Sequence, residues 1–312
     1  MPRKDALCLM VYVTLAVSIG FADLRMRAYP QLAFTKFIPD VVQNSEPAPG
    51  RYRVLAPFLN HYLAQSTGWS AQNVWYATRL AWIFLAFCIM HAYLRTWFEP
   101  EVALAGVALV AASLPLTFTN SWAHPDHMPE LALFTLGALA IARERWLLFA
   151  AALAAAALNR ETSVFLVLLC AIARPFSRRA AGLTLAFAAE WLAIYAGLRV
   201  VRGLSHYDYW QAGRNLADLG IPLPAVYDPY YRTYAYFALI AFGPMLFIAL
   251  RDRGAPLFVR RALLVVPVVA LVAFLFSNII EVRIFTPLYP LLLPAFLFAF
   301  FVPQGARAQG VR

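Results

Sequence analysis

The sequence predicts an all-α, polytopic integral membrane protein with about ten transmembrane helices, on three observations. The chain of 312 residues is 62% hydrophobic and 13% charged, whereas soluble domains carry about 25% charged residues. Its apolar residues form long runs separated by short polar segments, and about 20 apolar residues cross a bilayer as a helix. Acidic residues and histidines collect in one of the two alternating sets of loops. These observations favour a single transmembrane domain over residues 1–312.

Ten apolar runs are candidates for membrane spans, although several are short, so that eight or nine spans are an alternative. The runs cover residues 6–22, 73–95, 102–118, 129–142, 146–159, 163–174, 180–200, 233–250, 258–277 and 284–302. The first run follows Arg3 and Lys4, as in a signal peptide cleaved after Ala22. We favour an uncleaved first span, because the many spans that follow need no separate export signal.

Basic residues are dense in the short loops of one set, and this predicts the orientation. With the N-terminus in the cytoplasm, the cytoplasmic segments contain Arg3, Lys4, Arg95, Arg143, Arg145, Arg174, Arg178, Arg179, Arg251, Arg253, Arg260, Arg261, Arg307 and Arg312. The positive-inside rule predicts this arrangement. We therefore expect a multi-pass protein of the inner (cytoplasmic) membrane with both termini in the cytoplasm. The net charge of +10 then reflects topology, and no basic run long enough for a nucleic-acid arm is present.

The first outer loop, residues 23–72, is long and opens with Asp23 at the end of the first span. Residues 54–66 are apolar but too short to cross the membrane, which predicts an amphipathic helix on the membrane surface. Arg51 and Arg53 precede this helix. At headgroup depth, guanidinium groups bind phosphate bidentately; alternatively, they are interface anchors that extend toward water.

The second outer loop concentrates titratable side chains. His124, Asp126, His127 and Glu130 occur within one short, proline-containing stretch. Such a set is typical of a hard-metal site or an acid–base pair. The alternative is structural, because Asp126 would cap the next helix and Glu130 would lie in its first turn.

Two tight outer turns each place an arginine near a glutamate, Arg160 beside Glu161 and Glu281 before Arg283. Charges at membrane depth are costly unless they are paired or functional, so the first turn is either self-paired or part of a site. The last span contains three prolines, which predict a kinked or broken helix; they are Pro287, Pro290 and Pro294.

Aromatic side chains dominate the fourth outer loop, residues 201–232. They form either an interface belt or flat faces for stacking on sugar rings. Glu190 lies within the span at 180–200, and we expect it to be buried and paired with an arginine of another helix.

Together these features resemble the GT-C glycosyltransferases. The resemblance comprises the acid that ends the first span, the long outer loop with a surface helix, the acidic second outer loop and the outer arginines. The segments 52–57, 159–162 and 281–283 are similar to those of bacterial membrane proteins of that kind.

The resemblance implies an enzyme that transfers a sugar from a polyprenyl-phosphate carrier to an acceptor on the outer side of the membrane. Asp23 matches the family's catalytic carboxylate, and Asp126 matches its second acidic loop. Further roles are expected for two sets of residues. Arg51, Arg53, Arg160 and Arg283 would bind the carrier phosphate, and His124, His127, Glu161 and Glu281 would bind or orient the substrates.

Because the family's Asp-x-Asp pair is missing, a divalent metal is an open question. The expected partners are the polyprenyl-phosphate-linked sugar and membrane lipid, not nucleic acid. Two rival functions are a transporter or flippase for lipid-linked sugars and a membrane scaffold. A transporter often contains internal repeats, none of which is evident, and a scaffold needs no polar outer cavity.

Overall fold

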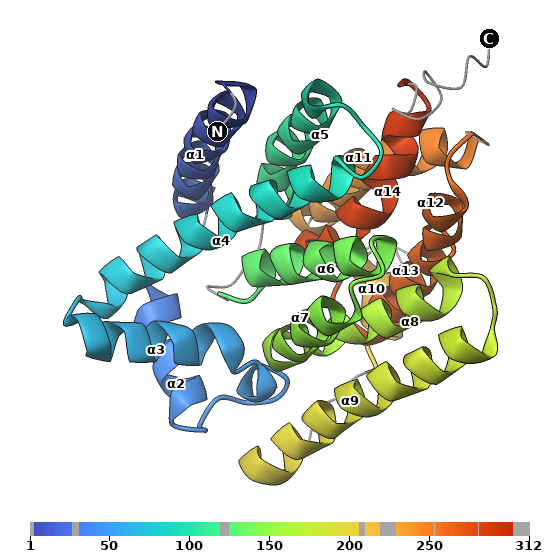
Figure 1. The fold of residues 1–312 in the computed structure, drawn as a ribbon. Coiled ribbons are helices and arrows are strands. Elements are labelled where there is room, and N and C mark those ends of the chain that lie inside the picture. Colours follow the sequence, from blue (N-terminus) through green and yellow to red (C-terminus); the bar gives the residue numbers. More distant parts are fainter. Residues whose placement is uncertain are drawn as a thin grey trace.

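The computed structural model describes residues 3–26, 31–118, 125–205, 210–218, 229–251, 254–279 and 281–301. Within these ranges the regular elements are all helices, without any strand. The predicted all-α class is therefore confirmed. The helices pack around a large core of buried apolar side chains (Figure 1).

Five helical segments in the described part of the chain are long and apolar enough to cross a membrane. They are Ala6–Arg25, Ala71–Leu94, Pro100–Thr117, Arg178–Arg202 and Leu257–Phe276. The other expected spans correspond to apolar helices of 10–17 residues, namely His127–Ala142, Trp146–Asn159, Glu161–Ala173, Ala238–Arg251 and Val282–Phe298. The structure thus indicates a membrane protein, and the expected number of ten spans is not confirmed.

The labels of Figure 1 follow the chain. The longest helices are α1 (Arg3–Met26), α4 (Ala71–Leu94), α9 (Arg178–Arg202) and α11 (Pro229–Arg251). Those of intermediate length are α3 (Leu55–Thr67), α5 (Pro100–Ser113), α6 (His127–Ala142), α7 (Trp146–Asn159), α8 (Val164–Ala173), α13 (Val265–Phe276) and α14 (Tyr289–Phe298). Short helices are α2 (Ile38–Val42), α10 (Ala212–Asp218) and α12 (Leu257–Ala262), with 3-10 turns η2 (Gly50–Tyr52), η4 (Glu161–Ser163) and η5 (Val282–Leu288).

Local sequence signals set several helix ends. Ser70 precedes α4, and its hydroxyl accepts a hydrogen bond from the Asn73 amide at 3.2 Å, which satisfies one free N–H of the first turn. Ser177 does the same for α9 through the Ala180 amide. Gly68 ends α3 at a φ of 69°, a left-handed conformation that glycine adopts without steric cost.

Helix α6 lies at the centre of the molecule, between α4 on one side and α7 and α8 on the other (Figure 1). Nearly all of its side chains are buried. Gly137 permits close packing, because a Cβ there would lie 2.7 Å from Leu166. The position of α6 matters for the site, since its N-terminal turn carries Asp126, His127 and Glu130.

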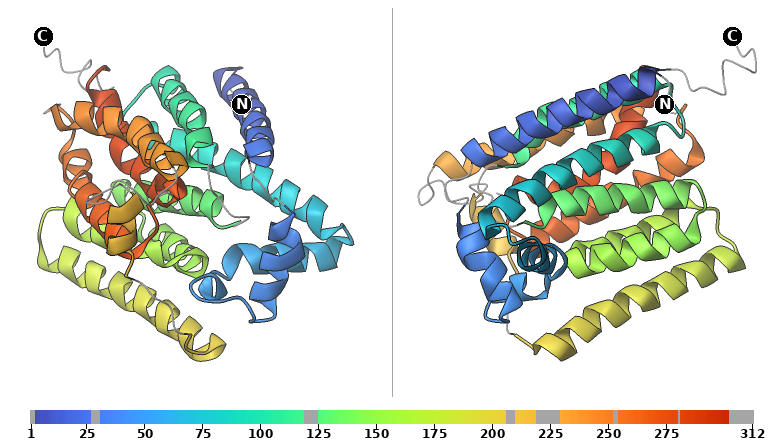
Figure 2. Two further views of the ribbon diagram at one scale, coloured as in Figure 1. Left: turned by 180° about the vertical axis from the view of Figure 1, so that it is seen from behind. Right: turned by 60° about the vertical axis from the view of Figure 1, so that its left-hand side comes forward.

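The segment 23–72, for which the sequence predicts an outer location, folds mainly into α2 and α3, which lie at one end of the helix bundle (Figure 2). α1 begins at the opposite end. The predicted helix at 54–66 is present as α3, with Leu59 and Tyr62 on its exposed side and Asn60 buried. Its location on a membrane surface stays a prediction.

The final span and the loop at 201–232 are both irregular. The prolines break the last helix as predicted, because η5 precedes α14. Much of the loop lies outside the described residues. Within it, α10 is held to the end of α13 by Asn215, whose side-chain amide donates to the carbonyls of Phe274 and Ser277 at 2.6 and 2.7 Å.

Glu190 differs from expectation. It is half-buried on α9, and no arginine of the described residues lies within ion-pair distance of it. The prediction was wrong because α9 lies at the edge of the bundle (Figure 1). A residue in the middle of this helix is therefore not in the middle of the protein.

Candidate functional site

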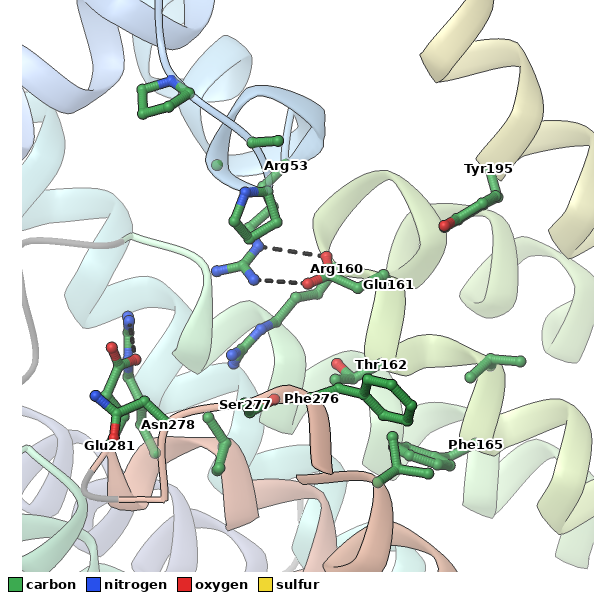
Figure 3. Close-up of a pocket in the computed structure, with 18 of the residues that line it drawn as sticks. Arg53, Arg160, Glu161, Thr162, Phe165, Tyr195, Phe276, Ser277, Asn278 and Glu281 are labelled. Carbon is green, nitrogen blue, oxygen red and sulfur yellow. Dashed lines mark hydrogen bonds and ion pairs between the residues drawn. The ribbon is translucent and has the colours of Figure 1, made fainter. Parts of the chain in front are cut away.

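A cavity of about 460 Å³ lies where the ends of several elements meet (Figure 3). The turn before η2, the η4 turn, α8, α9, the end of α13 and the start of η5 all contribute to its wall. This volume is within the range of about 300–1,000 Å³ that is typical of small-molecule sites.

The cavity has an aromatic part and a charged part. The aromatic side chains are Phe165, Trp191, Tyr195 and Phe276, and the charged ones are Glu46, Arg53, Arg160, Glu161, Glu281 and Arg283. Trp191 is oriented by a 2.9 Å hydrogen bond from its indole N–H to the Ser163 hydroxyl. The wall therefore combines flat apolar faces with donors and acceptors for a polar ligand.

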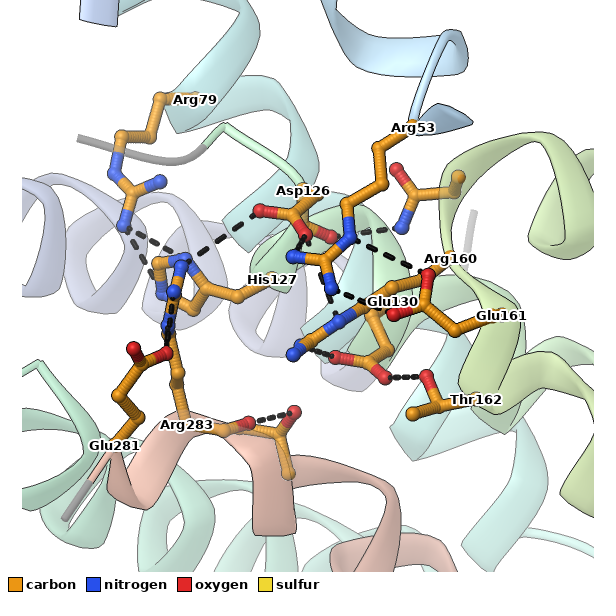
Figure 4. Close-up of polar contacts among 12 residues, drawn as sticks. Arg53, Arg79, Asp126, His127, Glu130, Arg160, Glu161, Thr162, Glu281 and Arg283 are labelled. Atoms are coloured by element: carbon orange, nitrogen blue, oxygen red, sulfur yellow. Dashed lines mark hydrogen bonds and ion pairs between the residues drawn. The ribbon is translucent and has the colours of Figure 1, made fainter. Parts of the chain in front are cut away.

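Asp126 lies behind the charged wall at the N-cap position of α6, and its side chain makes no capping hydrogen bond. It is fully buried, and three arginines from distant segments converge on its carboxylate (Figure 4). Arg53 Nη1 lies at 3.2 Å, Arg160 Nε at 3.6 Å and Arg283 Nη1 at 3.8 Å. The capping alternative for Asp126 thus gives way to a role in an ion-pair network.

The same arginines bind other acids. Arg160 Nη1 lies 2.5 Å from Glu130 Oε2, and Glu130 also accepts a hydrogen bond from the Thr162 hydroxyl. Arg53 Nη2 lies 2.7 Å from Glu161 Oε1. The turn at 159–162 is therefore not self-paired, because Arg160 and Glu161 each bind a residue of another element.

Arg283 completes this network, with Nη2 at 2.6 Å from Glu281 Oε2. We name the whole set the Asp126 cluster; it comprises Arg53, Asp126, Glu130, Arg160, Glu161, Thr162, Glu281 and Arg283. Arg160 Nε and Arg283 Nη1 are buried and have no hydrogen-bond acceptor among the described residues. Both atoms face the Asp126 carboxylate, at 3.6 and 3.8 Å, without making a hydrogen bond to it.

A second group, the Asp23 cluster, consists of Asp23, Arg79 and His127. Arg79 Nε forms an ion pair with Asp23, and Arg79 Nη2 lies 3.0 Å from His127 Nε2. All three side chains are buried, and none of them lines the large cavity. Arg79 was missed by the sequence analysis, although an arginine within an apolar run is itself a signal of a buried partner.

The predicted site residues are brought together in part. Arg53, Arg160, Arg283, Glu161 and Glu281 share the cavity wall. Asp23, Asp126 and His127 lie outside the wall in the two clusters, and His124 lies outside the described residues. Arg51 is directed elsewhere, since its Nε donates to the Glu46 carbonyl at 3.0 Å. Catalytic roles for Asp23 and Asp126 stay predictions.

The electrostatics of the outer turns follow from these pairs. Burial raises the pKa of the Glu161 carboxyl, but the charge of Arg53 and its hydrogen bonds outweigh burial, so the pKa is lowered overall. Burial lowers the pKa of the Arg53 guanidinium, but the charges of Glu161 and Asp126 raise it by more than burial lowers it. The guanidinium therefore stays charged. The pair is therefore ionised at neutral pH.

Arginines, rather than a preformed metal site, surround these acids. In the described part of the chain, no group of three or more His, Cys, Asp or Glu side chains is arranged to hold a metal ion. A divalent cation would have to share Glu161 or Glu281 with the arginine that now binds each one.

No protein-family model, curated protein or solved structure matches this chain. The resemblance to GT-C glycosyltransferases therefore stays a prediction. The functional argument depends on the cavity, its arginines and its aromatic side chains.

Proposed function

We propose that this chain is a membrane glycosyltransferase that moves a sugar from a polyprenyl-phosphate carrier to an acceptor on the outer side of the cytoplasmic membrane. One observation carries the proposal. Arg53, Arg160 and Arg283 meet at the wall of one cavity, and Arg160 Nε and Arg283 Nη1 make no hydrogen bond to the described residues, although they face Asp126 at 3.6 and 3.8 Å. These groups suit a phosphate that arrives with its ligand.

The chemistry of transfer requires such donors. The acceptor hydroxyl loses its proton to a carboxylate, and its oxygen bonds to the anomeric carbon of the sugar. The bond from that carbon to the carrier phosphate breaks, and the phosphate leaves with the electron pair. Arginines aimed at the phosphate stabilise the negative charge that grows on it.

The aromatic part of the cavity suits the sugar. Trp191 and Tyr195 are stacked on each other at 4.7 Å between ring centroids, and both line the cavity beside the arginines. Aromatic faces bind the apolar faces of sugar rings, while nearby charged groups bind their hydroxyls. A ligand with a sugar next to a phosphate would thus meet complementary groups at both ends.

The proposed orientation follows the loops. The cavity is formed by segments that the sequence analysis assigns to the outer side, including the turns at 159–162 and 281–283. With ten spans, a GT-C-like arrangement and both termini in the cytoplasm, the cavity would face the outer leaflet, where lipid-linked sugars are donors.

Reconstitution tests the proposal. Purified protein in lipid nanodiscs is given radiolabelled undecaprenyl-phosphate-linked hexoses and a mixture of lipid and glycan acceptors. We expect sugar transfer with release of undecaprenyl phosphate, and loss of transfer in Arg283→Ala. Arg95→Ala is the matched control, because Arg95 lies outside the cavity wall and is partly exposed.

The rival function is tested in the same system. Sealed vesicles loaded with the lipid-linked sugar would show its movement between leaflets, with the sugar–phosphate bond intact, if the protein were a flippase. Leaflet exchange without transfer to any acceptor would contradict the glycosyltransferase proposal.

A further inference from the structure

Glu46 is a carboxylate on the cavity wall that the sequence analysis did not select. It lies in the segment between α2 and η2, outside the expected spans, and lines the cavity together with the three arginines. No side chain of the described residues donates a hydrogen bond to its carboxylate or forms an ion pair with it. The Arg51 guanidinium binds the backbone carbonyl of Glu46 instead, at 3.0 Å.

The other acids near the site each form an ion pair with an arginine. Asp23 is bound by Arg79, and Glu130 by Arg160. In addition, Asp126 and Glu161 are bound by Arg53, and Glu281 is bound by Arg283. For Glu161, the charge of Arg53 lowers the pKa of the carboxyl and so weakens it as a proton acceptor. Among the described carboxylates of the cavity wall, Glu46 is the one that no arginine binds.

Gly50 leaves space that the Glu46 side chain occupies. A Cβ on Gly50 would lie 3.0 Å from both Glu46 Cγ and Glu46 Oε1, and 3.1 Å from Phe37 Cε2. These contacts are tighter than ordinary van der Waals contact, so alanine at position 50 would require the Glu46 side chain to shift slightly. The absence of a side chain there is what allows Glu46 to fold against the η2 turn.

The surroundings of Glu46 favour proton binding. Burial raises the pKa of its carboxyl and so does Asp40 of α2, while Lys36 and Arg53 lower it less, and the pKa is raised overall. Arg51 is bound to the Glu46 carbonyl. On α9, Arg202 donates to the Val41 carbonyl and Arg199 lies over the Tyr52 ring. A raised pKa makes a carboxylate a stronger proton acceptor.

We propose that Glu46 is the carboxylate that takes the proton from the acceptor hydroxyl, and that Gly50 is its positioning residue. This assignment rests on the proposed function. In the step, the hydroxyl proton passes to a Glu46 carboxylate oxygen, the hydroxyl oxygen bonds to the anomeric carbon, and the carrier phosphate leaves. The arginines then bind the carrier phosphate, and Asp126 acts through its ion pairs with them, not on the acceptor.

Labelling tests the carboxylate without any substrate. Dicyclohexylcarbodiimide reacts with protonated carboxyl groups in apolar surroundings and leaves ionised ones unmodified. We expect mass spectrometry of the native protein to find the adduct at Glu46 up to a higher pH than the adduct at Glu161, because the pKa of Glu46 is raised and that of Glu161 is lowered. Gly50→Ala should change the yield at Glu46 but not at exposed Glu99. Equal labelling of Glu46 and Glu161 would overturn the assignment.

Turnover tests the role. Glu46→Gln should lower transfer by roughly 100- to 10,000-fold, while equilibrium binding of radiolabelled undecaprenyl phosphate is kept. Glu46→Asp should retain part of the activity with a shifted pH profile, and Glu99→Gln is the control. Near-native turnover of Glu46→Gln would overturn the assignment of Glu46 as the base but not the proposed function. Absence of transfer by the native protein with every donor would instead overturn the proposed function and, with it, the role in transfer.

Discussion

The two buried clusters of this molecule contain the same kinds of groups in different surroundings. In the Asp23 cluster, Asp23 is fully buried against Arg79, away from the large cavity. In the Asp126 cluster, Arg53 and Arg283 are part of the cavity wall, and guanidinium N–H groups are left without acceptors among the described residues. The comparison shows that burial of arginines is common to both clusters, and that the adjoining cavity distinguishes the Asp126 cluster.

The energetics of buried ion pairs explain why both clusters can exist. Such a pair contributes little net stability, but removal of one partner leaves a buried charge and is strongly destabilising. The Asp23 cluster should therefore respond to mutation mainly through folding. The Asp126 cluster should respond through function as well as folding, because its arginines are equally buried but line the cavity.

The largest effect is expected from Arg79→Met. It leaves the Asp23 carboxylate buried without its partner, which should lower the free energy of unfolding by about 3–5 kcal/mol. Thermal unfolding of the purified protein in detergent measures this. The double variant with Asp23→Asn should recover most of the loss, since neither charge is then left alone.

One result for Asp23 would contradict the distinction between a structural Asp23 cluster and a functional Asp126 cluster. If Asp23→Asn folds normally, binds undecaprenyl phosphate and loses turnover, then Asp23 is a catalytic group, as the family resemblance implies. The Asp23 cluster would then be part of the site.

The next effect concerns Arg283→Lys. The ammonium group keeps the charge but cannot reproduce the paired contacts of the guanidinium. Transfer should fall by about 100- to 1,000-fold, the usual cost of one lost donor to a developing anion, with little change in melting temperature. Steady-state transfer with a labelled donor measures it. Equal losses of transfer and folding yield would show that Arg283 is structural.

A smaller effect is expected from Glu161→Gln, with a defined pH dependence. The lowered pKa means that the Glu161–Arg53 pair stabilises the fold above pH 4.5, the ordinary value, and that this contribution is lost as the pH falls through the folded-state pKa. The cost at neutral pH should be about 1 kcal/mol, because the carboxylate is partly exposed. Melting curves of both proteins should therefore converge in acid, and a constant difference would contradict the pairing.

The smallest effect should come from Arg95→Ala. Arg95 and Glu99 lie 3.8 Å apart with side chains 34% and 51% exposed, and exposed pairs contribute about 0–1 kcal/mol. Thermal unfolding and transfer should both stay close to native. A loss comparable to that of Arg79→Met would show that exposure does not separate the two kinds of ion pair.

Some of the site could be predicted from sequence. Arg160 and Arg283 were selected because charges at membrane depth are costly unless paired or functional, and Arg53 because a guanidinium at headgroup depth can bind phosphate; the three do converge. Arg51 was selected on the same ground as Arg53 but is directed away, since neighbouring residues in a turn face different directions. Glu46 was missed because one acid in a loop rich in proline and glycine has no local pattern.

The sequence by itself determined the helical class, the membrane character and the broken last helix, because hydrophobic runs and prolines act over a few residues. Only the tertiary structure decided the ion pairs. Arg53 and Glu161 are 108 positions apart, and Arg79 and Asp23 are 56 apart. Such pairs depend on how helices pack, and packing is set by the summed contacts of many side chains. For the same reason, no local pattern distinguishes an enclosed arginine from one beside a cavity.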